Sequence, residues 1–219
     1  MEIARDFPLF PLQLVALPTE LIPLHIFEDR YKALVARCLE EPTEFGIVCA
    51  DDDGLRATGC ACEIADVLER FDDGRINLVA RGTRPFRLDA EQADLPYPAG
   101  AVTFLADDPE AVPDPDLLAE VHEAYAELVL QATDRTPDLD EIAAMSAYQM
   151  AGTVEFAIEA KQHLLEARSE IARLQQLRRL LRAALRRLDF MERAQAVARS
   201  NGKVRIGPGD PPIPRPEDL

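Results

Sequence analysis

The chain has 219 residues, 47% of them hydrophobic, so it is long and apolar enough to bury a core. Its 40 acidic and 24 basic residues give a net charge of −16, which disfavours nonspecific binding to nucleic acid because such binding neutralises phosphates. No apolar run reaches the roughly 18 residues that span a bilayer, and no secretory signal pattern is present. We therefore expect a soluble, cytoplasmic protein whose four cysteines are reduced, with no membrane partner.

The first long apolar stretch is interrupted by prolines between residues 8 and 23. Proline lacks an N–H and fits neither a helix interior nor a central strand, so we predict two short extended pieces, Phe7–Leu12 and Gln13–Leu17, followed by a loop. From Ile26 onward the apolar residues recur at helical spacing, which predicts a one-sided helix. We expect its buried face to include Phe27, Tyr31, Leu34 and Cys38.

Short strands and turns dominate the next part of the chain and predict a small, mostly antiparallel, closed sheet. Gly74 ends an Asp-Asp-Gly turn, a strong hairpin signal between two strand-like runs. Gly59 and Gly82 interrupt those runs and are expected to mark bulges or close backbone approaches. The expected strands are Glu44–Asp51, Thr58–Phe71, Arg75–Leu88 and Ala99–Ala106.

Helices are predicted for most of the second half, after an acidic, proline-rich linker at Asp107–Asp116. Asp138 and Ser169 are expected to cap two of them. The predicted helices are Asp116–Thr133, one from Asp138 to Gly152, Val154–Ala167, and a long helix from Ser169 to about Arg199. The fold class is therefore α+β, with a β domain and one helix at 1–106, a helical subdomain at 107–199 and a disordered Pro/Gly-rich tail at 200–219.

The long last helix has leucines on one face and arginines on another. Residues 161–199 carry a net charge of +6, whereas residues 1–160 carry −22. Two interpretations stay open: a solvated basic face that complements the acidic body, or a surface that docks a partner or a second copy. The arginines concerned are Arg179, Arg182, Arg186 and Arg193.

Several dispersed motifs occur in the order typical of one family. FPLFPL and PTELIPLHIFEDRY come first, then a DGR hairpin with VARGTRPFRL, and later KQHLLE. Together they resemble the N-terminal (LON) domain of the ATP-dependent Lon proteases, over roughly residues 7 to 190. The sequence departs from the family pattern at Pro85, which separates Arg84 from Phe86.

The resemblance implies a PUA-like β pseudo-barrel followed by an α-helical bundle that ends in a long helix. It also implies a standalone, non-catalytic protein that recognises unfolded or extended polypeptide, or a partner protein, with a link to protein quality control or proteolysis. The alternative is a PUA-like nucleic-acid-binding module, although the acidic body disfavours it. We expect a monomer or a weak homodimer.

Candidate contacts for a polypeptide come from two segments of the predicted barrel. An aromatic side chain beside an arginine offers apolar area together with a hydrogen bond to a carbonyl or carboxylate group. The competing interpretation is that these aromatics belong to the core, whereas Arg30 and Arg84 are expected to be exposed. The candidates are Phe27, Arg30, Tyr31, Arg84 and Phe86.

Residues for catalysis or metal binding do not assemble into a recognisable pattern. The only Gly-Lys pair, at Gly202, lacks the upstream glycine and the following Ser or Thr of a phosphate-binding loop. Cys60 and Cys62 form a C-x-C pair without two further zinc ligands of matching spacing, so core thiols are favoured. The sequence predicts no enzyme activity, no catalytic residue, no metal and no cofactor.

Overall fold

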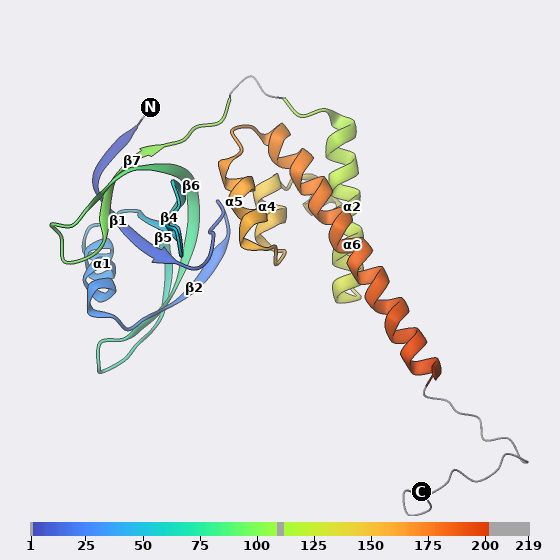
Figure 1. The fold of residues 1–219 in the computed structure, drawn as a ribbon, viewed down its shortest axis with the longest axis horizontal. Helices are drawn as coiled ribbons and strands as arrows, with labels where there is room; N and C mark the ends of the chain where they lie inside the picture. Colours follow the sequence, from blue (N-terminus) through green and yellow to red (C-terminus); the bar gives the residue numbers. More distant parts are fainter. Residues whose placement is uncertain (1, 109–111, 202–219) are drawn as a thin grey trace, which may run out of the picture.

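A computed structural model describes residues 2–108 and 112–201 of the chain. Figure 1 shows the strands together with helix α1 (Asp29–Glu40) at one end and the remaining helices at the other, with the C-terminal part of the last helix extending away from the other elements. The strands are β1 (Ile3–Leu12), β2 (Leu21–Ile26), β3 (Phe45–Asp51), β4 (Gly54–Leu55), β5 (Thr58–Arg70), β6 (Ile76–Gln92) and β7 (Ala99–Phe104). This α+β arrangement confirms the predicted fold class.

The sheet closes on itself through β1. Its order is β1-β7-β6-β5-β3-β4, and β1 also pairs with β3 in parallel. The other pairings are antiparallel, as the hairpin signals predicted. Strand β2 lies off this ring and pairs with the first half of β6.

Strand β1 contains two prolines and still has neighbours on both sides. It pairs with β7 from Ile3 to Pro8 and with β3 from Leu9 to Leu12. The two pairings occupy successive parts of the strand, so neither proline needs ladder bonds on both sides. The prediction of two short pieces is therefore wrong: β1 is one longer strand, and Gln13–Leu17 forms none.

Residues Leu21–Ile26 form strand β2, where the sequence pattern predicted a loop and the start of a helix, so that prediction is wrong. Helix α1 spans Asp29–Glu40, so it begins three residues after Ile26. Tyr31, Leu34 and Cys38 are buried on α1 as predicted. Phe27, in contrast, lies between β2 and α1 and is 58% exposed, so the prediction that it is a core anchor is wrong.

Both glycines that interrupt the predicted hairpin mark close approaches. A Cβ on Gly59 would collide with the ring of Phe86, and one on Gly82 would collide with the carbonyl oxygen of Leu17. The β5–β6 register also shifts between Ala61 and Cys62, beside Gly82. Backbone segments therefore pack at distances that only glycine allows.

Within the described residues five helices follow the sheet: α2 (Pro115–Thr133), α3 (Leu139–Ala143), α4 (Ala147–Gly152), α5 (Ile158–Glu166) and α6 (Glu170–Asn201). The single helix predicted from Asp138 to Gly152 is wrong, because Ser146 and Gln149 form a capping box that starts a new helix. Asp138 caps α3, and the Ser169 hydroxyl accepts a hydrogen bond from the N–H of Ala172.

The boundary predicted between residues 106 and 107 falls in the connection from β7 to α2. The predicted tail lies outside the described residues from 202 onward.

Two buried clusters hold the fold together. One lies among the barrel strands and centres on Phe86, which contacts Phe7 edge-on at 5.6 Å between ring centroids. The other is continuous from the barrel into the helices, from Phe10 through Val121 to Leu181. The helices therefore pack on the barrel through a shared apolar core.

Polar contacts add to this packing. Lys161 forms an ion pair with Glu20, and the side-chain amide of Gln162 donates to the carbonyl of Thr58 at 3.1 Å. Arg56 binds Glu159 through both terminal nitrogens, at 2.8 and 2.6 Å. These contacts join α5 to the barrel, which gives the KQ motif a structural role.

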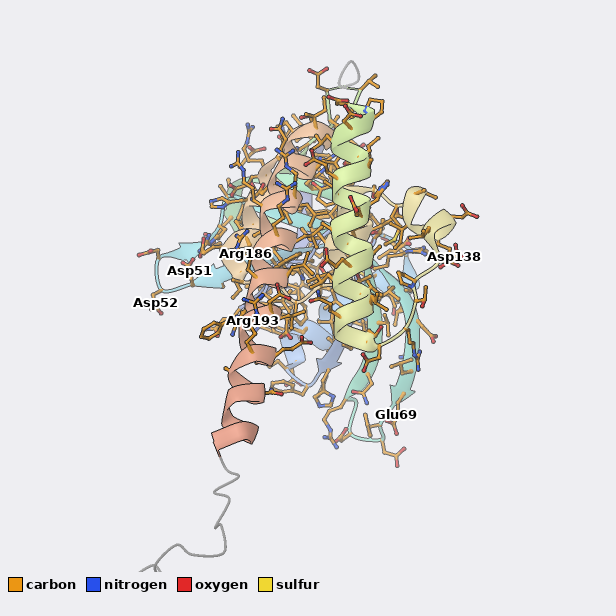
Figure 2. All side chains as sticks on the ribbon, turned by 90° about the vertical axis from the view of Figure 1, so that its right-hand side faces the viewer. Asp51, Asp52, Glu69, Asp138, Arg186 and Arg193 are labelled. Carbon is orange, nitrogen blue, oxygen red and sulfur yellow. The ribbon has the colours of Figure 1, made fainter. Side chains whose placement is uncertain are left out.

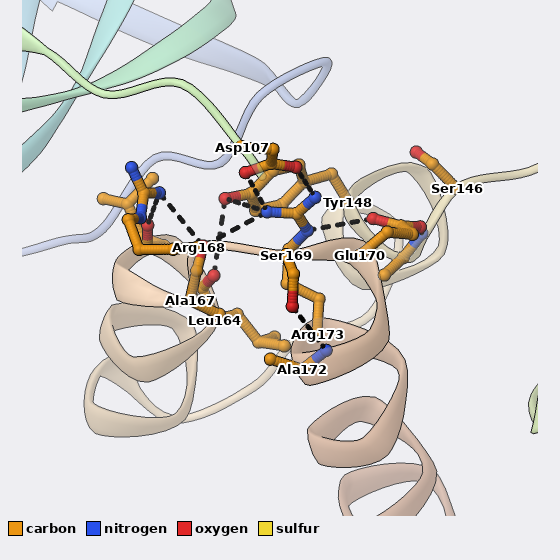
Figure 3. A network of polar contacts seen from close by, with 12 residues as sticks. Asp107, Ser146, Tyr148, Leu164, Ala167, Arg168, Ser169, Glu170, Ala172 and Arg173 are labelled. Atoms are coloured by element: carbon orange, nitrogen blue, oxygen red, sulfur yellow. Dashed lines mark hydrogen bonds and ion pairs between the residues drawn. The ribbon is translucent and has the colours of Figure 1, made fainter. Parts of the chain in front are cut away.

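The connection after β7 is fixed by a second polar network (Figure 3). Arg173 of α6 is 3% exposed and bonds to Asp107 and Glu170, with its guanidinium 4.4 Å from the centre of the Tyr148 ring. The hydrogen bond from Arg173 lowers the pKa of Asp107. A buried charge with two carboxylate partners ties this connection to the start of α6.

Candidate functional site

The structure does not bring the five predicted contact residues together on one surface. Phe86 is completely buried, so it contacts other core residues and offers no area to a ligand. Tyr31 is 7% exposed, and burial raises its pKa; its ring packs on Phe10 at 4.1 Å between centroids. For these two aromatics the competing core interpretation describes the structure.

The two arginines have different surroundings. Arg30 is exposed and forms an ion pair with Glu28 at 2.8 Å. Arg84 is held by Glu2 and Glu44, at 2.7 Å each, and its guanidinium lies 3.6 Å from the centre of the Phe104 ring. The hydrogen bond from Arg84 lowers the pKa of Glu2. Arg84 therefore already has its partners within the chain.

Ile3 on β1 and Leu68 on β5 are exposed apolar side chains of the barrel, and further ones lie in a row along β2. Residues of β2 alternate strictly between exposed and buried. Leu21 is 62% exposed, and Pro23 and His25 face solvent with it. Phe27 continues the row, since its ring stacks on His25 at 5.8 Å between centroids. We call these four side chains, Leu21, Pro23, His25 and Phe27, the β2 strip.

The β5–β6 hairpin borders the strip at its Phe27 end. Phe71 packs edge-on against His25 at 6.3 Å, and Arg75 lies 4.9 Å from the centre of the Phe71 ring. The Nδ1 of His25 is 2.6 Å from Oδ1 of Asn77, which fixes the imidazole. The arrangement is a partly aromatic surface with polar groups at its margin, a composition suited to binding apolar side chains.

An apolar hollow lies among the helices, and we call it the helix groove. It measures about 690 Å³ and runs between α2, α6 and the segment before α5. Its lining residues include Tyr125, Leu128 and Val129 of α2 and Ala184, Leu188 and Met191 of α6.

The four arginines of the last helix singled out from the sequence, Arg179, Arg182, Arg186 and Arg193, are exposed, whereas Arg173 of the same helix is buried. Figure 2 shows Arg186 and Arg193 projecting from α6, while Asp51, Asp52, Glu69 and Asp138 lie on exposed turns and at a hairpin end. Arg182 bonds to Glu120 at 2.9 Å. Arg179, Arg186 and Arg193 are exposed, follow a seven-residue spacing and form no ion pair with another described residue.

Groups suited to metal or thiol chemistry do not converge in the described part of the chain. Within 2–108 and 112–201 no cluster of three or more His, Cys, Asp or Glu could hold a metal ion. Cys60 and Cys62 are fully buried, and burial raises the pKa of the Cys60 thiol. None of the described helices is both long and apolar enough to cross a membrane.

Comparison with known proteins agrees with this architecture. The family model described as "ATP-dependent protease La (LON) substrate-binding domain" matches residues 6–183. The chain belongs to the LON substrate-binding domain family. The match is to that protease's substrate-binding domain and not to its ATPase or peptidase parts.

Two solved LON structures resemble most of this chain. A Lon N-terminal domain protein from Xanthomonas campestris is 27% identical with a TM-score of 0.60, and the match covers 81% of this chain and 97% of that one. The N-terminal domain of a Mycobacterium avium complex Lon protease shares the fold, with 23% identity, a TM-score of 0.58 and coverage of 78% and 95%. The β2 strip lies within the matched LON segment, whereas Phe190 and Met191 lie beyond it.

Proposed function

We propose that this LON-domain protein recognises unfolded or extended polypeptide without catalysing a reaction, and that the β2 strip makes the first contact. Membership of the substrate-binding domain family supports the class of ligand. The observation that carries the site is the row of exposed side chains that begins at Leu21 on β2 and ends at Phe27, one residue beyond the strand. Burying such side chains against a client releases ordered water and favours association.

The proposal revises the contact residues expected from sequence. Phe27 and Arg30, three residues apart in the chain, remain at the surface, whereas Phe86, Tyr31 and Arg84 act within the fold. A role in protein quality control or proteolysis follows if a bound client is passed to a protease. The exposed arginines of α6, Arg179, Arg186 and Arg193, are proposed as a second surface, for an acidic partner protein.

Nucleic acid is the less favoured ligand. Three barrel arginines that could contact phosphates are each bound to a carboxylate: Arg81 to Glu63, Arg84 to Glu2 and Arg87 to Asp89. Binding RNA would require breaking these pairs inside an acidic region with a net charge of −22 over residues 1–160. We expect no binding to single-stranded or duplex RNA at physiological salt.

Fluorescence anisotropy with labelled, permanently unfolded casein tests the site. The double variant Leu21→Ser/Phe27→Ser should bind about tenfold or more weakly, because two exposed apolar side chains are lost. The matched control is Phe190→Ser/Met191→Ser, which removes two exposed apolar residues of α6, one of them in the helix groove. Unchanged melting temperatures for both variants show that folding is preserved.

Two outcomes would contradict the assignment. If the Leu21→Ser/Phe27→Ser variant binds casein as the wild type does, and the Phe190→Ser/Met191→Ser variant does not, the binding site is the helix groove. No binding by the wild type would reject polypeptide recognition itself. The same preparation should hydrolyse neither ATP nor casein; turnover that disappears when a residue of this chain is changed would make the protein an enzyme.

A further inference from the structure

Strand β2 has a neighbour on one side only. It pairs with β6 from Leu21 opposite Arg81 to Ile26 opposite Ile76, and no other described strand pairs with it. The remaining long strands of the ring have partners on both sides over at least part of their length. The outer edge of β2 is therefore a strand edge open to pairing.

The backbone groups on that edge follow from the antiparallel register. Opposite residues alternate between pairs that exchange hydrogen bonds and pairs whose groups point outward. The N–H of Gly82 donates to the carbonyl oxygen of Glu20. Along β2 the residues that bond to β6 are therefore the even-numbered ones, Ile22, Leu24 and Ile26. Pro23 agrees with this phase, since a residue without an N–H fits an outward position.

The outward positions are consequently Leu21, Pro23 and His25. In this register the N–H groups of Leu21 and His25 and all three carbonyl oxygens point away from β6, to the side on which no other described strand pairs with β2. The same three residues carry three of the four exposed side chains of the β2 strip. Unpaired backbone groups and exposed apolar side chains thus occur along one edge.

A small hollow lies beside this edge. It measures about 190 Å³ and is enclosed by Leu21, Ile22 and Pro23 on one side and by Phe156 and Ile158 on the other. A strand added to β2 would direct alternate side chains to one face, and one of them could enter this hollow.

Resting on the function proposed above, we propose that a client segment binds by adding to the free edge of β2 as a further strand. The occupant is an extended, apolar-rich segment whose own N–H and C=O groups complete those of Leu21, Pro23 and His25. Main-chain hydrogen bonds are independent of sequence, which suits a protein that must accept many unfolded clients. Pro23 withholds one donor, so the edge pairs weakly and is protected from uncontrolled association.

Backbone-modified peptides test strand addition directly. The probe is a labelled Thr/Val-rich peptide with lysines at both ends, prepared with N-methyl groups on one or the other alternate set of residues. In a strand, only one alternate set points its N–H groups at β2. Methylating that set should weaken binding at least tenfold, and methylating the other set should have little effect.

A change in the protein tests the missing donor. Pro23→Val supplies an N–H at an outward position and should tighten binding about two- to tenfold, the net effect of one hydrogen bond. Pro42→Val is the matched control, because this exposed proline lies in the turn after α1, away from the edge. It should leave binding unchanged.

The outcomes separate this inference from the function on which it rests. If the peptide binds, depends on Leu21 and Phe27, and is weakened equally by both methylation patterns, side chains alone recognise it and strand addition is wrong. If the Pro23→Val variant binds the peptide no more tightly than the wild type does, strand addition is also contradicted. If the unmodified peptide and unfolded casein both fail to bind, strand addition and polypeptide recognition are overturned together.

Discussion

Strands β1 and β2 are built from similar residues, leucine, phenylalanine or isoleucine separated by proline, yet they lie in opposite environments. Strand β1 pairs with β7 and β3, and its central residues Phe7, Leu9 and Phe10 are buried. Strand β2 pairs with β6 alone, and every second residue faces water. The number of strand partners, and not apolar content, decides which of these segments becomes core and which becomes a binding surface.

The largest expected difference between the two strands is in stability. Phe7 packs edge-on against both Phe86 and Phe104, at 5.6 and 5.5 Å between centroids, so Phe7→Ala leaves a cavity and should cost about 3–5 kcal/mol of unfolding free energy. Phe27→Ala removes an exposed ring and should change it by no more than about 0.5 kcal/mol. Urea denaturation of both variants checks this. Equal losses would show that Phe27 is a core residue after all.

A smaller effect is expected where the chain passes from β1 to β2. A Cβ on Gly82 would meet the carbonyl of Leu17, a backbone atom that cannot rotate aside, so Gly82→Ala should cost about 1–3 kcal/mol. Gly152→Ala is the control, because its nearest neighbour is the Cβ of Glu20 at 3.3 Å, which a small shift relieves. Thermal unfolding is the measurement. A larger drop in melting temperature for Gly152→Ala than for Gly82→Ala would contradict the view that the close approach of Gly82 to Leu17 holds the chain in place before β2.

These strands also show what the sequence could and could not predict. The β5–β6 hairpin was predictable because its Asp-Gly turn is a local signal. Strand β2 was missed because its exposed positions Leu21 and Pro23 are themselves apolar, which hid the alternation of a half-buried strand. The start of α1 was consequently placed too early, and Phe27 was assigned to the helix face that packs on the core.

The role of Arg84 could not be inferred from its neighbours in sequence. Its partners Glu2 and Glu44 are 82 and 40 residues away, and only the closure of the sheet through β1 brings them together. Phe86 was identified as a motif residue, but its complete burial depends on the same closure. Family resemblance therefore identified Arg84 and Phe86 as motif residues. It did not predict whether each of them lies in the core or at the surface, because their contacts are with residues far away in the sequence.

The ion pair between Glu2 and Arg84, at the start of β1, should make the stability of the fold depend on pH. Arg84 lowers the pKa of Glu2, so this carboxylate stabilises the fold above the ordinary glutamate pKa of about 4.3, and the contribution is lost as pH falls through the lower, folded-state pKa. Glu2→Gln should therefore melt below wild type at neutral pH, and the difference should vanish in acid. Glu123→Gln, at an exposed position of α2, is the control. A Glu2→Gln deficit that persists at low pH would show that packing, and not charge, is responsible.

The smallest expected effect concerns the outer face that β2 shares with β6 and β5. Arg81, opposite Leu21, bonds to Glu63 of β5, with Nε 2.9 Å from Oε1 and both side chains about half exposed. Water and salt screen such a pair, so a double-mutant cycle with Arg81→Ala and Glu63→Ala should give a coupling of about 0.2–1 kcal/mol that falls as salt is added. The same cycle on Arg84 and Glu44, less exposed beside β1, should give the larger and less salt-sensitive coupling. A larger coupling for Arg81 and Glu63 than for Arg84 and Glu44 would contradict this expectation. The face that carries the β2 strip would then be less open to solvent than its exposed side chains indicate, and a client would have to displace Arg81 to reach the strip.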